Sequence, residues 1–236
     1  IQDLGNHRVK ITYSSKASEV QNGMCFQSRP TVRDHAGTFF WKSKDITMTS
    51  LDIHFLHGFG MVGQHSENIT MDDVDFEAPK ESGRTTAGYA DFVQMSGCKG
   101  TINISNCTFA GPHDDPINIH GTFNTVTAIS SDRRTITVQY NHNETAGFPN
   151  FFEGDEIEFM TKGNMITVED SVRTVTKVDG PDGMGGNMGD GSGSLTTIKL
   201  TLNEAVPSDV QVNQHVVENI TYTPTVNITN CEFKEV

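Results

Sequence analysis

The sequence predicts an all-β protein, namely a right-handed parallel β-helix that carries an inserted small antiparallel β-barrel or sandwich. Two observations lead to this prediction. A short apolar pattern recurs four times, and a long segment with a different strand pattern separates the third copy from the fourth. The chain of 236 residues is long enough to bury a core, with 35% hydrophobic residues.

The repeated pattern consists of two short alternations of apolar residues around a bend. Its copies are DITMTSLDIHF from Asp45, NITMDDVDFEA from Asn68, TINISNCTFAG from Thr101 and TVNITNCEFKE from Thr225. Aligned, they form four apolar columns: Ile46–Ile69–Ile102–Val226, Met48–Met71–Ile104–Ile228, Leu51–Val74–Cys107–Cys231 and Ile53–Phe76–Phe109–Phe233. Like residues stack in this way in a parallel β-helix, where neighbouring coils lie about 4.8 Å apart. Residues 1–122 and 219–236 are therefore expected to form the coils.

The segment between the third and fourth copies, residues 123–218, is expected to form the inserted domain. Its strand-like runs are TVTAIS, RTITVQY, DEIEFM, SVRTVTKV and TTIKLTL, separated by polar turns. This spacing is typical of a small antiparallel barrel or sandwich. The stretch GPDGMGGNMGDGSGS, residues 180–194, has too few acidic ligands for a calcium loop and is interpreted as a hairpin tip.

A second strand in each coil is predicted from offsets of 23, 33 and 24 residues. These offsets align Gly37, Gly60, Val93 and Ile117, and then Phe39, Val62, Met95 and Ile119. They also place His35, Gly58, Asp91 and Asp115 in one column, and Asp34, His57, Ala90 and Asp114 in the next. Two carboxylates on adjacent coils repel each other, so at least one pKa in the Asp91–Asp115 pair is expected to rise unless a cation or a tightly held water lies between them. The turn before Pro116 indicates a corner, where the alternation of inward and outward side chains need not hold.

The stretch GPHDDPINIHGT, residues 111–122, places Asp114 directly before Asp115. Together with Asp91, these carboxylates are the candidate catalytic residues of an inverting glycoside hydrolase, which needs an acid and a base about 6.5–9.5 Å apart. Asp114 is offset from the stacked pair, so it can act as the acid while Asp91 and Asp115 hold the attacking water. The candidate substrate-binding residues are polar neighbours in the same scheme: His57, Gln94, His113, Asn118 and His120.

The charge of the chain argues against two classes of partner, and the spacing of its cysteines argues against a metal site. The net charge is −13 and no run is rich in Lys or Arg, which argues against nucleic acid and anionic membranes as partners. No apolar run approaches the ~20 residues of a membrane span, and the sequence does not start with a positively charged, apolar leader, so any signal peptide is expected upstream of Ile1. The four cysteines lack metal-ligand spacing and are expected to be reduced core thiols. No metal and no cofactor are expected.

Trp41 is either a sugar-stacking or a packing residue.

The stretch YADFVQMSGCKGTINISNCTFAGPHDDPINIHGT, residues 89–122, resembles the core of glycoside hydrolase family 110. This family comprises β-helical, exo-acting α-1,3-galactosidases, including enzymes that remove the blood-group B galactose. The resemblance implies an inserted barrel, an inverting mechanism without metal, Asp114 as proton donor, and Asp91 and Asp115 as the residues that position water. It also implies terminal α-galactosides as substrates and a periplasmic, extracellular or cell-surface location in a bacterium. Family members are longer, so the chain is expected to be a fragment.

Three alternatives stay open. A β-helical polygalacturonase also uses Asp residues from adjacent coils, but no Gly-His-Gly follows the acidic pair and no Arg-Ile-Lys lies downstream. In a polysaccharide lyase the acidic residues would bind calcium and a Lys or Arg would abstract the proton. The third alternative is a non-catalytic, glycan-binding solenoid.

Overall fold

The computed structural model describes residues 1–15, 17–26, 33, 35–142, 145–146, 148–181 and 196–235. The chain forms two compact units, Ile1–Pro30 and Thr31–Val236. In the first unit, strands β1 (Gln2–Gly5) and β2 (Arg8–Lys10) pair antiparallel.

The turn between β1 and β2 explains why these residues do not form a parallel coil. Asn6 and His7 both have positive φ, 50° and 56°, as in the two-residue turns that close antiparallel hairpins. A parallel pair would instead need a long crossover connection. The expectation that coils begin at residue 1 is therefore wrong for residues 1–10.

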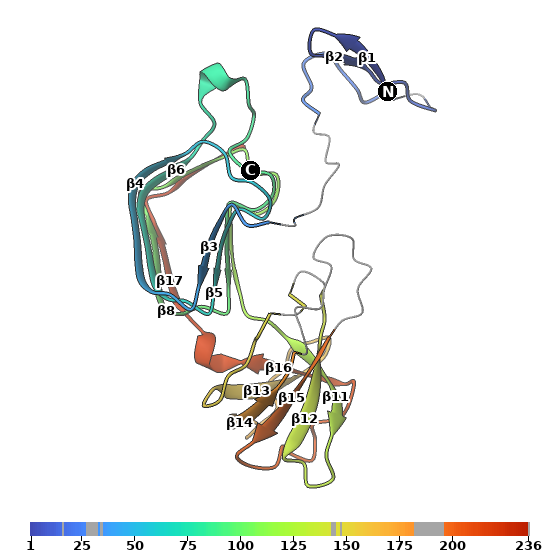
Figure 1. Cartoon of the computed structure of the whole chain (residues 1–236), viewed down its shortest axis with the longest axis vertical. Coiled ribbons are helices and arrows are strands. Elements are labelled where there is room, and N and C mark those ends of the chain that lie inside the picture. Colours follow the sequence, from blue (N-terminus) through green and yellow to red (C-terminus); the bar gives the residue numbers. More distant parts are fainter. Residues whose placement is uncertain are drawn as a thin grey trace. The chain divides into compact units, whose positions relative to one another are not determined.

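Two parallel sheets form one part of the second unit (Figure 1). The first sheet has the strand order β10 (Ile117–His120), β7 (Val93–Ser96), β5 (Met61–Gln64) and β3 (Thr38–Trp41). The second contains β4 (Lys44–Ile53), β6 (Glu67–Phe76), β8 (Lys99–Ser105), β9 (Thr108–Ala110), β17 (Thr225–Thr229) and β18 (Glu232–Lys234). The chain alternates between the sheets, and a 3-10 turn, η1 (Lys80–Ser82), follows β6.

The strand pairing confirms the columns predicted for the repeated pattern. Ile46 pairs with Ile69, Ile69 with Ile102, and Ile102 with Val226. The last of these pairings spans the long interruption, and Phe109 likewise pairs with Phe233. Apolar columns in the sequence were thus enough to establish the pairing in the second sheet.

The register predicted for the first sheet is wrong by one residue between β5 and β7. Val93 pairs with Met61 rather than with Gly60, and Gln94 pairs with Val62. The second sheet keeps the predicted offset because its β6–β8 pairing has an irregularity between Glu67 and Ile69 that absorbs one residue. A slip of one residue moves side chains to the opposite face, so Val62 shares the face of Gln94 rather than that of Met95.

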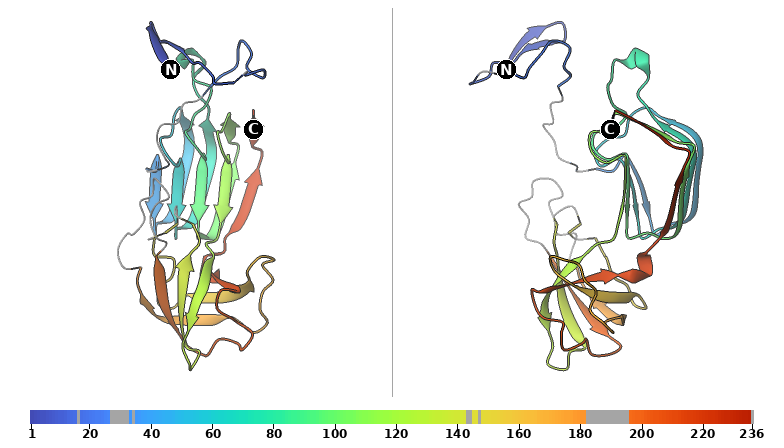
Figure 2. Two further views of the ribbon diagram at one scale, coloured as in Figure 1. Left: turned by 90° about the vertical axis from the view of Figure 1, so that its right-hand side faces the viewer. Right: turned by 180° about the vertical axis from the view of Figure 1, so that it is seen from behind.

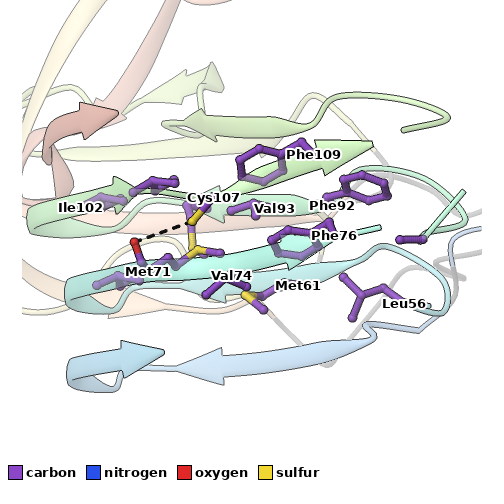
Figure 3. Close-up of a cluster of buried hydrophobic side chains, with 14 of the residues drawn as sticks. Leu56, Met61, Met71, Val74, Phe76, Phe92, Val93, Ile102, Cys107 and Phe109 are labelled. Carbon is purple, nitrogen blue, oxygen red and sulfur yellow. Dashed lines mark hydrogen bonds between the residues drawn. The ribbon is translucent and has the colours of Figure 1, made fainter. Parts of the chain in front are cut away.

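Apolar side chains from both sheets fill the space between them (Figure 3). Within this core, the rings of Phe76 and Phe109 stack with centroids 5.1 Å apart, and Phe92 and Phe233 extend the stack at 5.4 and 5.2 Å. Phe76, Phe92 and Phe109 have no exposed surface. Each buried ring contributes roughly 1.5–3 kcal/mol by leaving water, so the column binds successive strands together.

The other part of the second unit is a closed antiparallel barrel, which lies between β10 and β17 in the sequence (Figures 1 and 2). Its strands, in order around the barrel, are β11 (Asn124–Ile129), β12 (Thr135–Tyr140), β15 (Thr197–Leu202), β14 (Arg173–Asp179), β13 (Glu156–Thr161) and β16 (His215–Asn219). The predicted all-β class and antiparallel barrel are confirmed. A 3-10 turn, η2 (Ile220–Tyr222), leads to β17. The interpretation of residues 180–194 falls, beyond 181, outside the described residues.

The four cysteines are all free thiols. Burial raises the pKa of Cys98 and Cys107 to about 11, so both stay protonated and unreactive at neutral pH. Cys25 is exposed, so the expectation of a core thiol is wrong at this position.

An aromatic junction connects the first sheet to the barrel. The His65 ring lies edge-on to Trp41, Phe152 and Tyr222, with centroids 5.3, 5.2 and 4.7 Å away. The Lys42 ammonium lies 3.3 Å from the centre of the Phe152 ring, a cation–π contact. Trp41 is therefore a packing residue of this junction.

The junction predicts a pH dependence of stability. Burial lowers the pKa of His65 to about 4, and the Lys42 charge adds to the effect. Between the unfolded value of about 6.5 and pH 4, the unfolded chain binds a proton that the folded chain does not. The contribution of His65 to the free energy of unfolding is therefore fully present above pH 6.5. It falls by roughly 3 kcal/mol in all as the pH drops toward 4.

The measurement is urea unfolding of wild type and His65→Gln between pH 4 and 7.5. The difference in unfolding free energy should shrink by a large part of that amount as the pH falls. A difference that stays constant over the whole range would contradict the role given to His65.

Candidate active site

The outer face of the first sheet is the floor of a cavity of about 760 Å³, within the range of roughly 300–1,000 Å³ for small-molecule sites. Alternation along the strands explains its lining. On β7, Val93 and Met95 point into the core, while Gln94 and Ser96 line the cavity. Burying one face of the sheet thus assigns the other face to the cavity.

The floor changes from apolar to polar across the sheet. One column of paired residues runs from Phe39 on β3 through Val62 and Gln94 to Asn118 on β10. Phe39 is half exposed although it is a large apolar residue. A floor with apolar and amide halves suits a ligand that has one apolar face and a rim of hydroxyl groups, as a pyranose sugar does.

Three carboxylates line the end of the cavity where β7 and β10 begin. Asp91 is only 2% exposed, whereas Asp114 and Asp115 are exposed. Ile117 pairs with Val93, and the Phe92 amide donates to the Asp115 carbonyl at 3.0 Å, so Asp91 and Asp115 lie in neighbouring segments that lead into paired strands. Both precede their strands, which explains how Asp91 reaches the cavity although strand alternation would send it inward.

The charged form of Asp91 is disfavoured. Burial raises the pKa of this carboxyl group, the Arg33 guanidinium opposes the rise, and the Asp114 charge adds to it. The Asn118 amide donates to Asp91 Oδ2 at 3.4 Å and lowers the pKa slightly, while Asp115 contributes least. The sequence predicted a raised pKa, but the main cause is loss of water rather than the stacked neighbour.

Arg33 is a site residue that the sequence did not indicate. Its guanidinium donates to the Asp114 carboxylate, lies 3.7 Å from Asp91 Oδ1 and stacks over the Phe59 ring at 5.2 Å. It precedes β3 and belongs to none of the repeated patterns, so no spacing could have identified it. Its neighbour Asp34 falls outside the described residues.

Gln94 fixes the orientation of His120. His120 Nδ1 lies 2.7 Å from the Gly121 carbonyl, which can only accept, so Nδ1 is the donor. In the neutral ring Nε2 then accepts from the Gln94 amide nitrogen, also 2.7 Å away. Gln94 Oε1 is left buried without a protein hydrogen-bond partner. Both side chains line the cavity, as does Asn118, so three predicted binding residues come together.

Two other predicted binding residues, His57 and His113, are not among the described residues that line the cavity. His57 is exposed, and its ring packs 5.9 Å from that of His35. The corrected register explains why His57 does not line the cavity. After the shift of one residue, His57 no longer shares a column with Asp114. The same shift moves Gly58 out of the column of Asp91, and Phe59 takes its place there.

The barrel supplies another wall of the cavity, which the sequence did not predict. Its lining residues are Phe123, Asn141, His142, Thr145 and Phe148. Asn141 is held by hydrogen bonds to Thr125 Oγ1 at 2.6 Å and to the Phe123 carbonyl at 2.9 Å. The buried Tyr140 hydroxyl donates to the Phe148 carbonyl. These bonds fasten the cavity wall to the barrel.

In the part of the chain that the structure describes, no three His, Cys, Asp or Glu side chains are arranged to hold a metal ion. Nor does any helix in these residues have the length and apolar character needed to cross a membrane.

The fold and the cavity define a β-stranded protein with a carboxylate-lined site, and comparison with known proteins identifies its family. Residues 135–181 match the family model of the GLAA-B beta-barrel domain II. The chain is similar to proteins named alpha-1,3-galactosidase A: 46% identical over all 236 residues to that of Streptomyces avermitilis, 39% over 232 residues to that of Bacteroides thetaiotaomicron, and 31% over 231 residues to that of Akkermansia muciniphila.

These alignments cover 100%, 97% and 98% of the chain, but 37%, 38% and 36% of the relatives. The chain therefore spans a little over a third of the length of these relatives. It belongs to the α-1,3-galactosidase family, as its resemblance in sequence indicated.

The close approach of the turn at Gly60 to the turn at Asp91 predicts that replacing this glycine destabilises the protein. Gly60 has a φ of 76°, and a Cβ on it would lie 2.0 Å from the Asp91 carbonyl oxygen. Gly60→Ala should therefore destabilise the protein by about 3 kcal/mol or more, because it adds a backbone clash to the strain of positive φ. It should also displace Asp91.

Gly83→Ala is the matched control. Gly83 has a φ of 68° with no atom within 4 Å of the added Cβ, so only the conformational cost of about 1 kcal/mol remains. Urea unfolding of both variants measures the difference. Equal costs would show that the contact between Gly60 and Asp91 is not tight.

Proposed function

We propose that the chain is the catalytic part of an inverting, exo-acting glycoside hydrolase that releases terminal α-1,3-linked galactose from glycans. The observation that carries the proposal is the group of three carboxylates, Asp91, Asp114 and Asp115, at one end of a cavity lined with amide and imidazole groups. The relatives named alpha-1,3-galactosidase A support galactose as the sugar.

In the proposed reaction, Asp114 protonates the glycosidic oxygen as the bond from this oxygen to the anomeric carbon breaks. Asp91 and Asp115 orient a water molecule and accept its proton while its oxygen attacks the opposite face of the same carbon. The products are free galactose of inverted configuration and the shortened glycan. Gln94, Asn118 and His120 bind the sugar hydroxyl groups, while His57 and His113 have no direct role in this scheme.

Asp91 is the second candidate for the acid. Burial raises the pKa of Asp91, which favours the protonated form that a general acid needs, and Arg33 contacts Asp114. In that assignment Asp114 and Asp115 would hold the water. The two assignments predict opposite results when the Asp91→Asn and Asp114→Asn variants are compared on substrates with good and poor leaving groups.

The proposal extends to the architecture and location of the protein. The two parallel sheets are coils of a right-handed parallel β-helix that continues in the longer protein, and residues 123–218 are a domain inserted into it. The continuous columns of paired residues support this. We place the protein in the periplasm, at the cell surface or outside a bacterium, where glycan substrates occur.

A calcium-dependent polysaccharide lyase is the second candidate function, because Arg33 lies beside the acidic group as a lyase base would. A lyase would leave a carbon–carbon double bond in one product and lose activity with a calcium chelator. The proposed hydrolase adds water, forms no double bond and does not respond to chelation.

The mechanism predicts the anomer that is released. Hydrolysis of an α-galactoside should yield β-galactose first, which proton NMR detects before mutarotation. Initial release of α-galactose would contradict the proposal, because retention requires a nucleophile at ~5–5.5 Å and a covalent intermediate.

Asparagine variants distinguish the acid from the residues that hold water. Asp114→Asn should lower the turnover of a natural disaccharide by at least about a hundredfold, yet spare much of the cleavage of an activated aryl α-galactoside, whose phenolate leaves without protonation. Asp91→Asn and Asp115→Asn should impair both substrates alike, because each reaction needs the water.

The exposed Asp52 on β4, outside this cavity, provides the control variant Asp52→Asn, which should leave both rates unchanged. If Asp91→Asn spares the aryl substrate and Asp114→Asn does not, the acid is Asp91. If none of the three variants slows turnover, these carboxylates are not the catalytic groups and the proposed mechanism is wrong. If wild type itself binds the glycan without cleaving it, the chain is a glycan-binding solenoid rather than an enzyme.

A further inference from the structure

Arg33 contacts two of the three carboxylates, Asp91 and Asp114. It donates to Asp114 and lies 3.7 Å from Asp91 Oδ1, so one guanidinium joins the buried carboxylate to an exposed one. Phe59 lies beneath the guanidinium at 5.2 Å and limits its movement. Arg33 itself is 25% exposed and lines the cavity.

An inverting hydrolase needs two carboxyl groups in opposite protonation states at the same pH. The guanidinium cannot lose its proton, so its charge is present throughout the working range. It favours the ionised form of Asp91 and opposes the repulsion that Asp91 experiences from Asp114 and Asp115. Among the residues that the structure describes, the other titratable groups lining this cavity are His35, His120 and His142.

The contact can persist during the reaction. A protonated carboxyl group still offers its carbonyl oxygen to a guanidinium N–H. Once the proton has moved to the glycosidic oxygen, the same N–H groups face a full carboxylate, and the hydrogen bond becomes stronger. The contact therefore favours the carboxylate that forms as the proton is transferred.

We propose that Arg33 is a positioning residue that ties Asp114 to Asp91 and sets the pH range in which the acid and the base hold opposite protonation states. This inference rests on the proposed hydrolase function. It does not depend on which of the two carboxyl groups is the acid, because Arg33 approaches both.

The test is the pH profile of kcat/KM for an α-galactoside, measured on the full-length protein with Arg33→Gln and Arg33→Lys. Without the cation the buried Asp91 carboxyl group holds its proton more tightly. The limb of the profile that Asp91 controls should then move to higher pH by about one unit in Arg33→Gln, and the maximum should fall by about tenfold or more. Arg33→Lys keeps the charge but loses the planar fork, so the same limb should move by less than half as much.

Arg84→Gln is the matched control, because Arg84 also stacks on a phenylalanine, Phe55, at 4.4 Å but does not line the cavity. Its pH profile should equal that of wild type. If Arg33→Gln lowers activity with both limbs unchanged, Arg33 has only a structural role and the inference is wrong. If wild type cleaves no α-galactoside at any pH, the proposed function fails instead, which separates the two failures.

Discussion

The pairing of strands in the first sheet is the constraint on which the site depends. Because side chains alternate between two faces, burying Val93 and Met95 obliges Gln94 and Ser96 to face outward. The core and the cavity floor are therefore two consequences of one register. In the core, the stacked rings of Phe76, Phe109 and Phe233 link successive strands of the second sheet, which packs against the inner face of the first. The positions of the polar groups on the floor thus follow from apolar packing on the opposite face.

The carboxylates lie where this alternation ends. Asp91 and Asp115 come before their strands, at a corner where the backbone turns. The corner allows a carboxyl group to be almost fully buried and still reach the cavity. Burial and the Arg33 charge act on Asp91 in opposite directions, so its protonation depends on a balance between solvent exclusion and one guanidinium.

Much of this arrangement was predictable from the sequence, for identifiable reasons. Repeats of apolar residues established the second sheet, including the return of Phe233 to Phe109 after the barrel. Spacing also placed Asp115 beside Asp91. Sequence offsets failed in the first sheet, because the irregularity between Glu67 and Ile69 changes the count in one sheet only. Sequence offsets also could not identify Arg33, because this residue belongs to no repeat. Nor could they identify the barrel wall, because the barrel and the parallel sheets have different sequence patterns, and a contact between them produces no regular spacing.

The barrel wall has a consequence for how such a site can change over time. Asn141 and Phe148 are fastened to barrel residues, whereas Gln94 and Asn118 are held by the parallel sheet. Substitutions in the loop that follows Tyr140 therefore leave the strand pairing of the sheet untouched. One side of the cavity can be remodelled while the other keeps its geometry. In a fold of this kind, ligand preferences can therefore change without a change in the register of the sheet.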